Sequence, residues 1–144
     1  MKISLFIDKD ADERIEIYAH ERNDLIEQIE ALVCSREVNI VGYKDGEIIP
    51  LAQDRIFRIF VEENKVYAST DSGKYQLKFR LYQLEEMLAN TFIKINQSAL
   101  VNKKHIRKFS SSWGGSLIVE LNNGETDCIS RRQTNHVMKR MGIK

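Results

Sequence analysis

The sequence predicts a mostly β domain of the α+β class, in which short strands outnumber helices. Short segments with alternating or β-branched apolar residues recur along the chain, and Gly, Asn and Asp separate them at turn-like positions. Three segments show the apolar period of a helix. Apolar residues make up 42% of the 144 residues and charged residues 30%, which is the balance of one soluble domain with a buried core.

The chain begins with a predicted strand and helix. Residues 2–8 read KISLFID, and their apolar side chains largely alternate with polar ones, as in a strand. Asp10 or Asp12 then caps a helix that is expected to run to about Val33. Acidic residues fill its first turn, where the helix dipole favours them.

A regular apolar stripe marks one face of this predicted helix. Its members are spaced three and four residues apart: Ile15, Tyr18, Leu25, Ile29 and Leu32. The stripe fits two arrangements, a helix packed on its own sheet or a homodimer surface. Residues 36–43 form a second predicted strand, before a turn signal at Asp45-Gly46. We therefore expect a strand–helix–strand unit over residues 1–46.

Residues 47–144 are predicted to form the β-rich part. Strands are expected at residues 47–51, 55–61, 66–70, 74–79, 92–95, 106–109, 116–121 and 125–129. Helices are expected at residues 81–88 and 130–141. Turn signals lie at residues 63–64, 71–73, 114–115 and 122–124.

Several classes of protein are not expected from the sequence. The N-terminus lacks a signal-peptide pattern, and no run approaches the ~18 apolar residues of a membrane span, so we expect a cytoplasmic protein. Cys34 and Cys128 have no metal-ligand spacing and are interpreted as buried small residues. Motifs for nucleophilic, nucleotide or metal-dependent catalysis are absent, so neither an enzyme nor a cofactor is predicted.

Charge is distributed unevenly along the chain, although the total is only +1. Residues 1–47 hold 6 Lys and Arg against 12 Asp and Glu. Residues 93–144 hold 10 basic residues against 3 acidic ones. A basic C-terminal third indicates a partner with many negative charges, and nucleic acid is one such partner.

Two segments resemble the LytTR family of bacterial DNA-binding domains. The first, FIKINQSALVN at residues 92–102, contains an aromatic residue, a basic residue, a polar turn with Ser, and a Val-Asn end. The second, ISRRQ at residues 129–133, follows about thirty residues later and opens the last helix with a Ser-Arg pair. The resemblance covers roughly residues 47–141. It implies an elongated stack of small antiparallel sheets with short helices, whose loops enter successive major grooves of DNA.

The start of the last predicted helix is the first candidate for DNA contact. Ser130 is a suitable helix cap, and an Arg just inside the helix can bind guanine through two hydrogen bonds. The resemblance gives the base-reading position to Arg132. Arg131 is interpreted as a phosphate contact or a structural pair, and Gln133 completes the contact segment. Surface arginines without a ligand are the alternative, although positive charge is unfavourable at a helix start.

The other candidates lie in turns and on lysines. In the family the turn at Asn96, Gln97 and Ser98 faces the nucleic acid. Gln97 matches the residue nearest the bases, where many members have Arg, and Gln can pair with adenine. A simple polar turn is the alternative. The resemblance also makes Asn64 and Lys65 a third reading loop. Phosphate contacts are expected from Lys94, Lys103 and Lys104.

We therefore expect a bacterial transcriptional regulator that reads short direct repeats in promoter DNA through loops. A homodimer is expected, and the resemblance suggests a small membrane protein as an inhibitor. One alternative is a protein-interaction module, whose basic face would bind an acidic protein or a membrane surface. Another is an RNA-binding β protein, which would expose aromatic side chains for base stacking on a sheet face.

Overall fold

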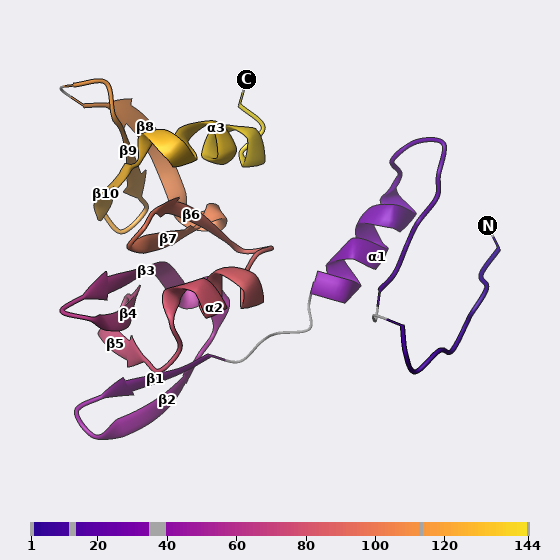
Figure 1. Cartoon of the computed structure of the whole chain (residues 1–144), viewed down its shortest axis with the longest axis horizontal. Helices are drawn as coiled ribbons and strands as arrows, with labels where there is room; N and C mark the ends of the chain where they lie inside the picture. The colour runs from indigo at the N-terminus through magenta and orange to yellow at the C-terminus, as the bar shows by residue number, and fades with distance from the viewer. Residues whose placement is uncertain (1, 12–13, 35–39, 113, 144) are drawn as a thin grey trace. The chain divides into compact units, whose positions relative to one another are not determined.

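The computed structural model describes residues 2–11, 14–34, 40–112 and 114–143. The chain forms two compact units, residues 1–36 and residues 37–144. Figure 1 labels the helices and strands of both units.

The first unit contains one helix, α1 (Asp24–Cys34). The Asn23 side chain accepts a hydrogen bond from the Ile26 amide at 3.0 Å, which is the geometry of a helix cap. Asp24 and Glu27 then lie in the first turn, where the helix dipole favours negative charge. Ile26 is the buried apolar residue of the described part of this unit.

Two predictions for the first unit were wrong. Residues 2–8 form no strand, and Ile3, Leu5, Phe6 and Ile7 are between 81% and 93% exposed. An alternating pattern gives a strand only where a neighbouring strand takes its backbone hydrogen bonds. The helix starts at residue 24 and not near residue 10, because Asn23 supplies the cap. Residues 8–11 form a turn instead. Asp12, the other predicted cap, lies outside the described residues.

The second unit is built on a seven-stranded antiparallel sheet with the order β2-β1-β5-β4-β3-β7-β6. Its strands are β1 (Ile40–Lys44), β2 (Glu47–Leu51), β3 (Ile56–Glu62), β4 (Lys65–Thr70), β5 (Gly73–Leu77), β6 (Phe92–Asn96) and β7 (Ala99–Asn102). The strand predicted at residues 36–43 thus belongs to this sheet from Ile40 onward, and residues 36–39 lie outside the described residues.

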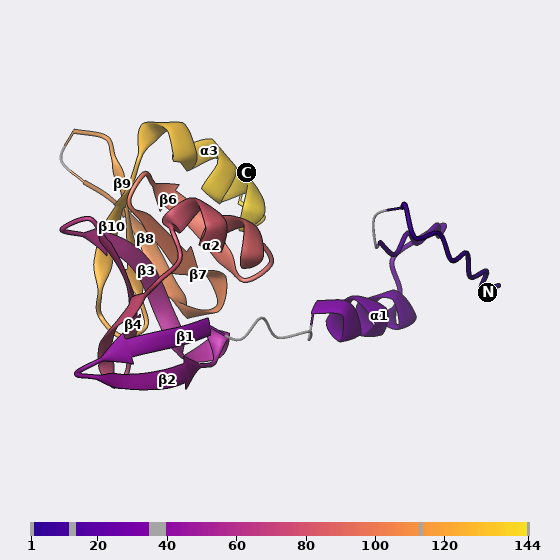
Figure 2. The same ribbon diagram turned by 60° about the horizontal axis from the view of Figure 1, so that its bottom comes forward.

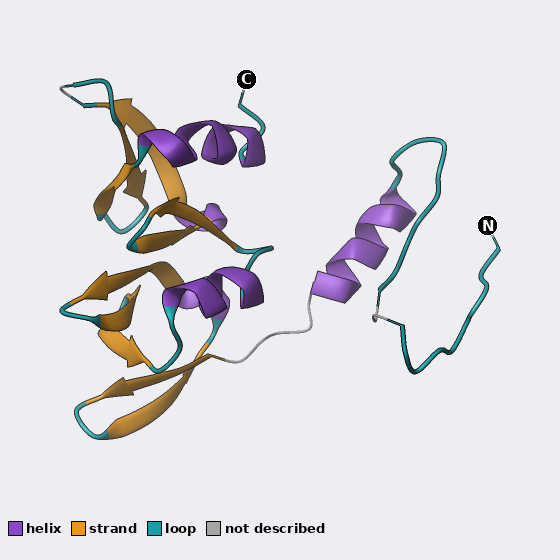
Figure 3. Ribbon diagram, in the orientation of Figure 1, coloured by secondary structure: helices purple, strands orange, loops and turns teal. Residues whose placement is uncertain are grey.

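A smaller sheet has the order β10-β9-β8, from β8 (Ile106–Ser111), β9 (Leu117–Leu121) and β10 (Thr126–Ile129). The helices of this unit are α2 (Leu81–Met87) and α3 (Arg131–Arg140). Two 3-10 turns that were not predicted, η1 (Gln53–Arg55) and η2 (Lys103–His105), connect strands. Figures 2 and 3 show strands dominating the unit, which confirms the predicted mostly β, α+β fold with short helices.

The β6–β7 hairpin is shared by the two hydrophobic cores of this unit. Leu100 and Phe92 pack in one core, with α2 and strands β1 to β5. Ile93 and Val101 point the other way, into a second core with β9, β10 and α3. All four residues of β7 are buried, although no strand was predicted there. A strand covered on both faces reads as a continuous apolar run and not as an alternation.

Two hairpins close through tight turns that require left-handed backbone. Asp45 and Gly46 have φ of 50° and 79°, and Glu63 and Asn64 have φ of 51° and 63°. Two consecutive positive φ angles characterise the type I′ turn, whose twist matches that of the flanking strands. Both turns were predicted, and the second holds Asn64 at the tip of the β3–β4 hairpin.

Cys128 departs from expectation within this fold. Cys128 is exposed on β10, whereas a buried small residue was predicted. The neighbouring Ile129 takes the core-facing position instead, because successive side chains of a strand point to opposite faces.

Asn102 holds the end of β7 to the start of β3. It is fully buried, and its amide nitrogen donates to the carbonyl oxygens of Gln53 and Ile56 at 3.1 and 3.0 Å. Its side-chain oxygen accepts from the Lys104 amide at 3.0 Å. A buried side chain therefore satisfies three backbone groups at the junction of η1, β3 and η2.

We expect Asn102→Ala to lower the free energy of unfolding by about 2 kcal/mol, because it leaves these three backbone groups without a partner. Urea denaturation measures the change. Asn135→Ala, an exposed Asn on α3, is the matched control and should stay within about 0.5 kcal/mol of the wild type. Equal stability of the two variants would contradict this role.

Candidate nucleic-acid interface

Two polar turns lie side by side at one end of the strands of the large sheet, where β3 ends and β7 begins. This end of the sheet is called the reading edge. Strands β3 and β7 pair antiparallel, with Phe60 opposite Ala99, so the end of β3 meets the start of β7. The Val61 amide donates to the Ser98 carbonyl at 2.9 Å. The β3–β4 turn and the β6–β7 turn therefore project from the same edge, on the left of the second unit in Figure 1.

The start of α3 is attached to this edge through β6. The Ser130 amide donates to the Ile95 carbonyl at 2.9 Å, and the Asn96 side chain donates to the Cys128 carbonyl at 2.7 Å. Ser130 occupies the cap position, as predicted, but its side chain makes no capping hydrogen bond. Its carbonyl instead accepts from the Thr134 hydroxyl at 3.0 Å.

The predicted contact residues at the helix start differ in how far they are engaged. Arg131 is exposed, and its guanidinium donates to the Gly114 carbonyl at 3.3 Å. Arg132 is exposed, and no hydrogen bond or ion pair engages its side chain among the residues that the structure describes. Gln133 is half-buried. Of the two arginines, Arg132 therefore has the guanidinium that is more available to a ligand.

The turn residues show the same contrast. Asn64, Lys65, Gln97 and Ser98 are exposed. Asn96 is engaged within the protein: its nitrogen also donates to Asp127 at 3.1 Å, and its oxygen accepts from the Ser98 amide at 2.8 Å. The turn therefore presents Gln97, while Asn96 holds the turn in place.

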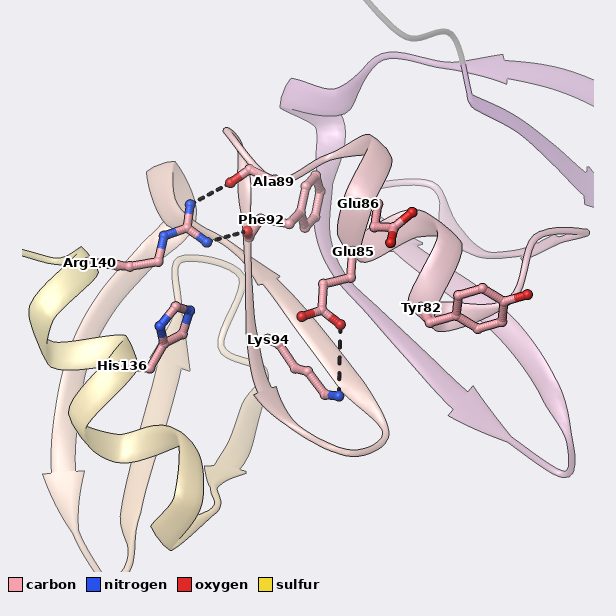
Figure 4. A pocket seen from close by; sticks show the side chains of 8 residues that line it. All are labelled: Tyr82, Glu85, Glu86, Ala89, Phe92, Lys94, His136 and Arg140. Carbon is pink, nitrogen blue, oxygen red and sulfur yellow. Dashed lines mark hydrogen bonds and ion pairs between the residues drawn. The ribbon is translucent and has the colours of Figure 1, made fainter. Parts of the chain in front are cut away.

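Two basic residues of this region interact with groups of the protein itself. In Figure 4 the Lys94 ammonium lies 3.8 Å from the Glu85 carboxylate, beside a hollow of about 420 Å³ between α2 and α3. At the other end of that hollow, Arg140 donates to the carbonyls of Ala89 and Phe92. Part of the basic C-terminal third thus stabilises the fold.

Lys103 and Lys104 lie away from this edge. They form η2, which follows the opposite end of β7 from the Gln97 turn. Four extended residues separate the two ends by about 13 Å. The Lys104 ammonium also lies 3.3 Å from the Asp54 carboxylate. The structure therefore brings nine of the eleven predicted contact residues to one region and leaves these two outside it.

An ionic network that was not predicted joins the two sheets behind this edge. The Arg58 guanidinium on β3 contacts Glu125 at 2.9 Å and Asp127 at 2.6 Å, both from the β9–β10 hairpin. The Ser69 hydroxyl donates to the same Glu125 carboxylate at 3.0 Å. Asp127 in turn accepts from Asn96. The network links β3, β4, β6 and β10, and it fixes the turn that presents Gln97.

Other kinds of site are not found in the described part of the chain. Its residues contain no group of three or more His, Cys, Asp or Glu side chains that could hold a metal ion. Among those residues, no helix has the length and apolar character needed to span a membrane.

Comparison with known proteins relates the second unit to a family of DNA-binding domains. The model of the LytTr DNA-binding domain matches residues 46–142. The chain is 33% identical over 146 residues to proteins named uncharacterized HTH-type transcriptional regulators in Staphylococcus aureus strains MSSA476 and MW2, with 99% of each chain covered. A solved LytTr DNA-binding domain from Bacillus cereus has a TM-score of 0.69 at 20% identity, and the match covers 73% of this chain and 97% of that one.

The fold differs from what the names of these relatives suggest. A helix-turn-helix places two helices around one short turn. In the described residues of this chain, five strands separate α2 from α3. The likeness to the solved domain shows the fold, in which turns and a helix start project from antiparallel sheets.

We expect Arg58→Ala to lower the free energy of unfolding by about 1–3 kcal/mol, because Glu125 and Asp127 would remain close together without their shared cation. The three side chains are 21% to 31% exposed, so solvent weakens the effect relative to a fully buried pair. Lys74→Ala breaks the exposed pair with Glu62 and should cost less than about 1 kcal/mol. The measurement is urea denaturation of both variants. Equal losses in the free energy of unfolding would contradict the role of the network.

Proposed function

The chain belongs to the LytTR family of DNA-binding domains and is a DNA-binding transcriptional regulator, and from this premise we propose that it reads specific promoter sequences through the edge described above. Arg132, Gln97 and Asn64 would contact base edges. Lys65, Arg131 and Lys94 would contact phosphates, with Ser98 and Gln133 beside them and Asn96 holding the turn. The observation that carries this proposal is the convergence of two exposed polar turns and the start of α3 on one edge of the sheet.

The proposed base contacts follow from side-chain chemistry. An Arg guanidinium can donate two hydrogen bonds to one guanine in the major groove, and Gln or Asn can do the same with adenine. Arg132 is exposed without a partner in the described residues, so its donors are available for such a contact. Gln97 is exposed at the tip of a turn whose backbone is held by Asn96. A fixed turn supports sequence reading because little ordering is needed on binding.

The distribution of charge supports DNA as the ligand. Three acidic residues near the edge have cationic neighbours: Glu62 pairs with Lys74, and Glu125 and Asp127 pair with Arg58. Glu63, in the β3–β4 turn, is exposed and makes no ion pair with the residues that the structure describes. The acidic excess of the chain lies instead in residues 1–47. Intramolecular pairing therefore limits the repulsion of phosphate by Glu62, Glu125 and Asp127, but not by Glu63.

We also propose that the regulator is a cytoplasmic homodimer that reads direct repeats. Ten of the fifteen large apolar side chains exposed in the described residues belong to the first unit, among them Phe6, Tyr18 and Leu25. Such a concentration of exposed apolar surface marks an interaction site. A second copy would cover it and would bring two reading edges to successive sites. A small membrane protein as inhibitor stays a prediction from the resemblance.

The two alternatives are less well supported. An RNA-binding sheet needs open aromatic faces, whereas Phe60, Tyr67 and Tyr43 are half-buried and lie beneath the cations of Arg58, Lys74 and Lys78. A protein-interaction module would need no sequence preference for DNA. Selection of binding sites from a random pool of duplexes distinguishes it from a regulator: enrichment of a common motif supports sequence reading, and no enrichment supports the interaction module.

We expect Arg132→Ala to weaken binding to the selected duplex by ~1–3 kcal/mol and to relax the preference at one base pair. The measurement is fluorescence anisotropy titration against the selected duplex and single-base variants of it. Lys139→Ala, an exposed basic residue in the last turn of the same helix, is the control and should keep the preference. Unchanged discrimination in Arg132→Ala would exclude a base-reading role for this residue.

We expect Leu25→Glu to convert the dimer into a monomer, because it places a charge in the exposed apolar surface of the first unit. Gln28→Glu introduces the same charge at an exposed position of the same helix and should leave the dimer intact. Sedimentation velocity gives the oligomeric state, and the thermal transition of the β-rich unit serves as the folding control. A wild-type monomer at micromolar concentration would contradict the proposal.

A further inference from the structure

A second hollow lies at the reading edge, between the two polar turns and the segment that connects β5 to α2. Its volume is about 920 Å³. Asn64, Lys65 and Gln97, three of the residues proposed above to contact DNA, line it. Its lining also includes Lys78, Phe79, Arg80 and Tyr82, from the connection after β5 and the first turn of α2. The hollow is thus continuous with the proposed contact residues.

The lining of this hollow is strongly basic. Lys65, Lys78, Arg80 and Lys94 contribute four cations, and Glu85 contributes the single anion among the lining residues. Glu85 lies near Lys94 at 3.8 Å, and the Lys78 ammonium lies 4.3 Å from the centre of the Tyr43 ring. Lys65 and Arg80 are exposed, with no hydrogen bond or ion pair to their side chains from the residues that the structure describes. Two available cations therefore line the hollow.

Arg80 occupies a position that helix stability does not explain. It is the cap residue of α2, and its backbone amide donates to the Gln83 side chain at 2.9 Å. The Arg80 guanidinium has no acceptor and so cannot cap a donor of the first turn. No acidic residue lies in that turn. Positive charge is unfavourable at this end of a helix, where Ser, Thr, Asp or Asn would stabilise it. The start of α3 carries Arg131 and Arg132 in the same unfavourable setting, and both helix starts lie on the same side of the second unit (Figure 1).

We infer that this hollow binds the sugar-phosphate backbone of duplex DNA, with Arg80 and Lys65 as the phosphate contacts. The inference rests on the proposed function and adds the β5–α2 connection to the DNA-contacting surface. The exposed rings of Phe79 and Tyr82 offer apolar surface to the deoxyribose between the phosphates. Contacts of this kind fix the position of the protein on the duplex and carry no sequence information.

The test compares Arg80→Ala, Arg80→Lys and Arg55→Ala with the wild type. Arg55 is the matched control, because it is an exposed Arg that precedes β3 and therefore lies at the end of that strand remote from the β3–β4 turn. Affinity for the selected duplex and for an unrelated duplex is measured by fluorescence anisotropy over a range of salt concentrations. Loss of one phosphate contact lowers the slope of log affinity against log salt by ~0.9.

We expect Arg80→Ala to lower the affinity for both duplexes by the same factor and to reduce the slope of log affinity against log salt by ~0.9. Arg80→Lys and Arg55→Ala should keep the wild-type slope. Thermal denaturation of Arg80→Ala checks that the fold is retained. An unchanged slope in Arg80→Ala overturns the inference, and a loss confined to the selected duplex assigns Arg80 to base reading instead. The proposed function fails separately, if the wild-type protein shows no preference for any duplex.

Discussion

The β6–β7 hairpin is the constraint on which the reading edge depends. Its side chains alternate between two cores, with Leu100 in one and Val101 in the other. A shift of one residue in the pairing of β7 with β3 would exchange these faces and place the polar Asn102 out of reach of its backbone partners. Because the register is fixed in this way, the turn that carries Gln97 is held at a defined height beside the β3–β4 turn.

The ionic network around Arg58 extends this order to the smaller sheet. Removing three charged side chains from water costs much of what their attraction returns, so the network is better understood as a device for orientation than as a large source of stability. Arg58 links β3 to Asp127, and Asp127 links to Asn96. The β9–β10 hairpin, which carries Asp127, leads directly into α3. One cation thereby relates the Gln97 turn to the start of the helix that carries Arg132.

The sequence predicted those elements whose signals are local. The turns at Asp45-Gly46 and Glu63-Asn64 and the helix that carries Arg131 and Arg132 depend on neighbouring residues, and the structure contains all of them. β7 escaped prediction because burial on both faces removes the alternation that identifies a strand. The Arg58 network could not be predicted, because its partners are 67 and 69 residues away and only the fold brings them together. The prediction of a strand at residues 2–8 was wrong for the converse reason. The alternating pattern is present, but no strand of the described chain pairs with these residues.

The total charge of a segment overstates what it offers to DNA. Arg140 is bound to two backbone carbonyls, Lys94 lies near Glu85, and Lys104 pairs with Asp54 away from the edge. Conversely, Lys65 and Arg80 belong to the middle of the chain, where basic and acidic residues cancel in number. In the fold these two are exposed and line one hollow with Gln97, and the nearby Glu62 and Glu85 lie against other cations, Lys74 and Lys94. The surface available to phosphate is therefore set by which cations the fold leaves without an internal partner, and it crosses the boundary between the neutral and basic parts of the sequence.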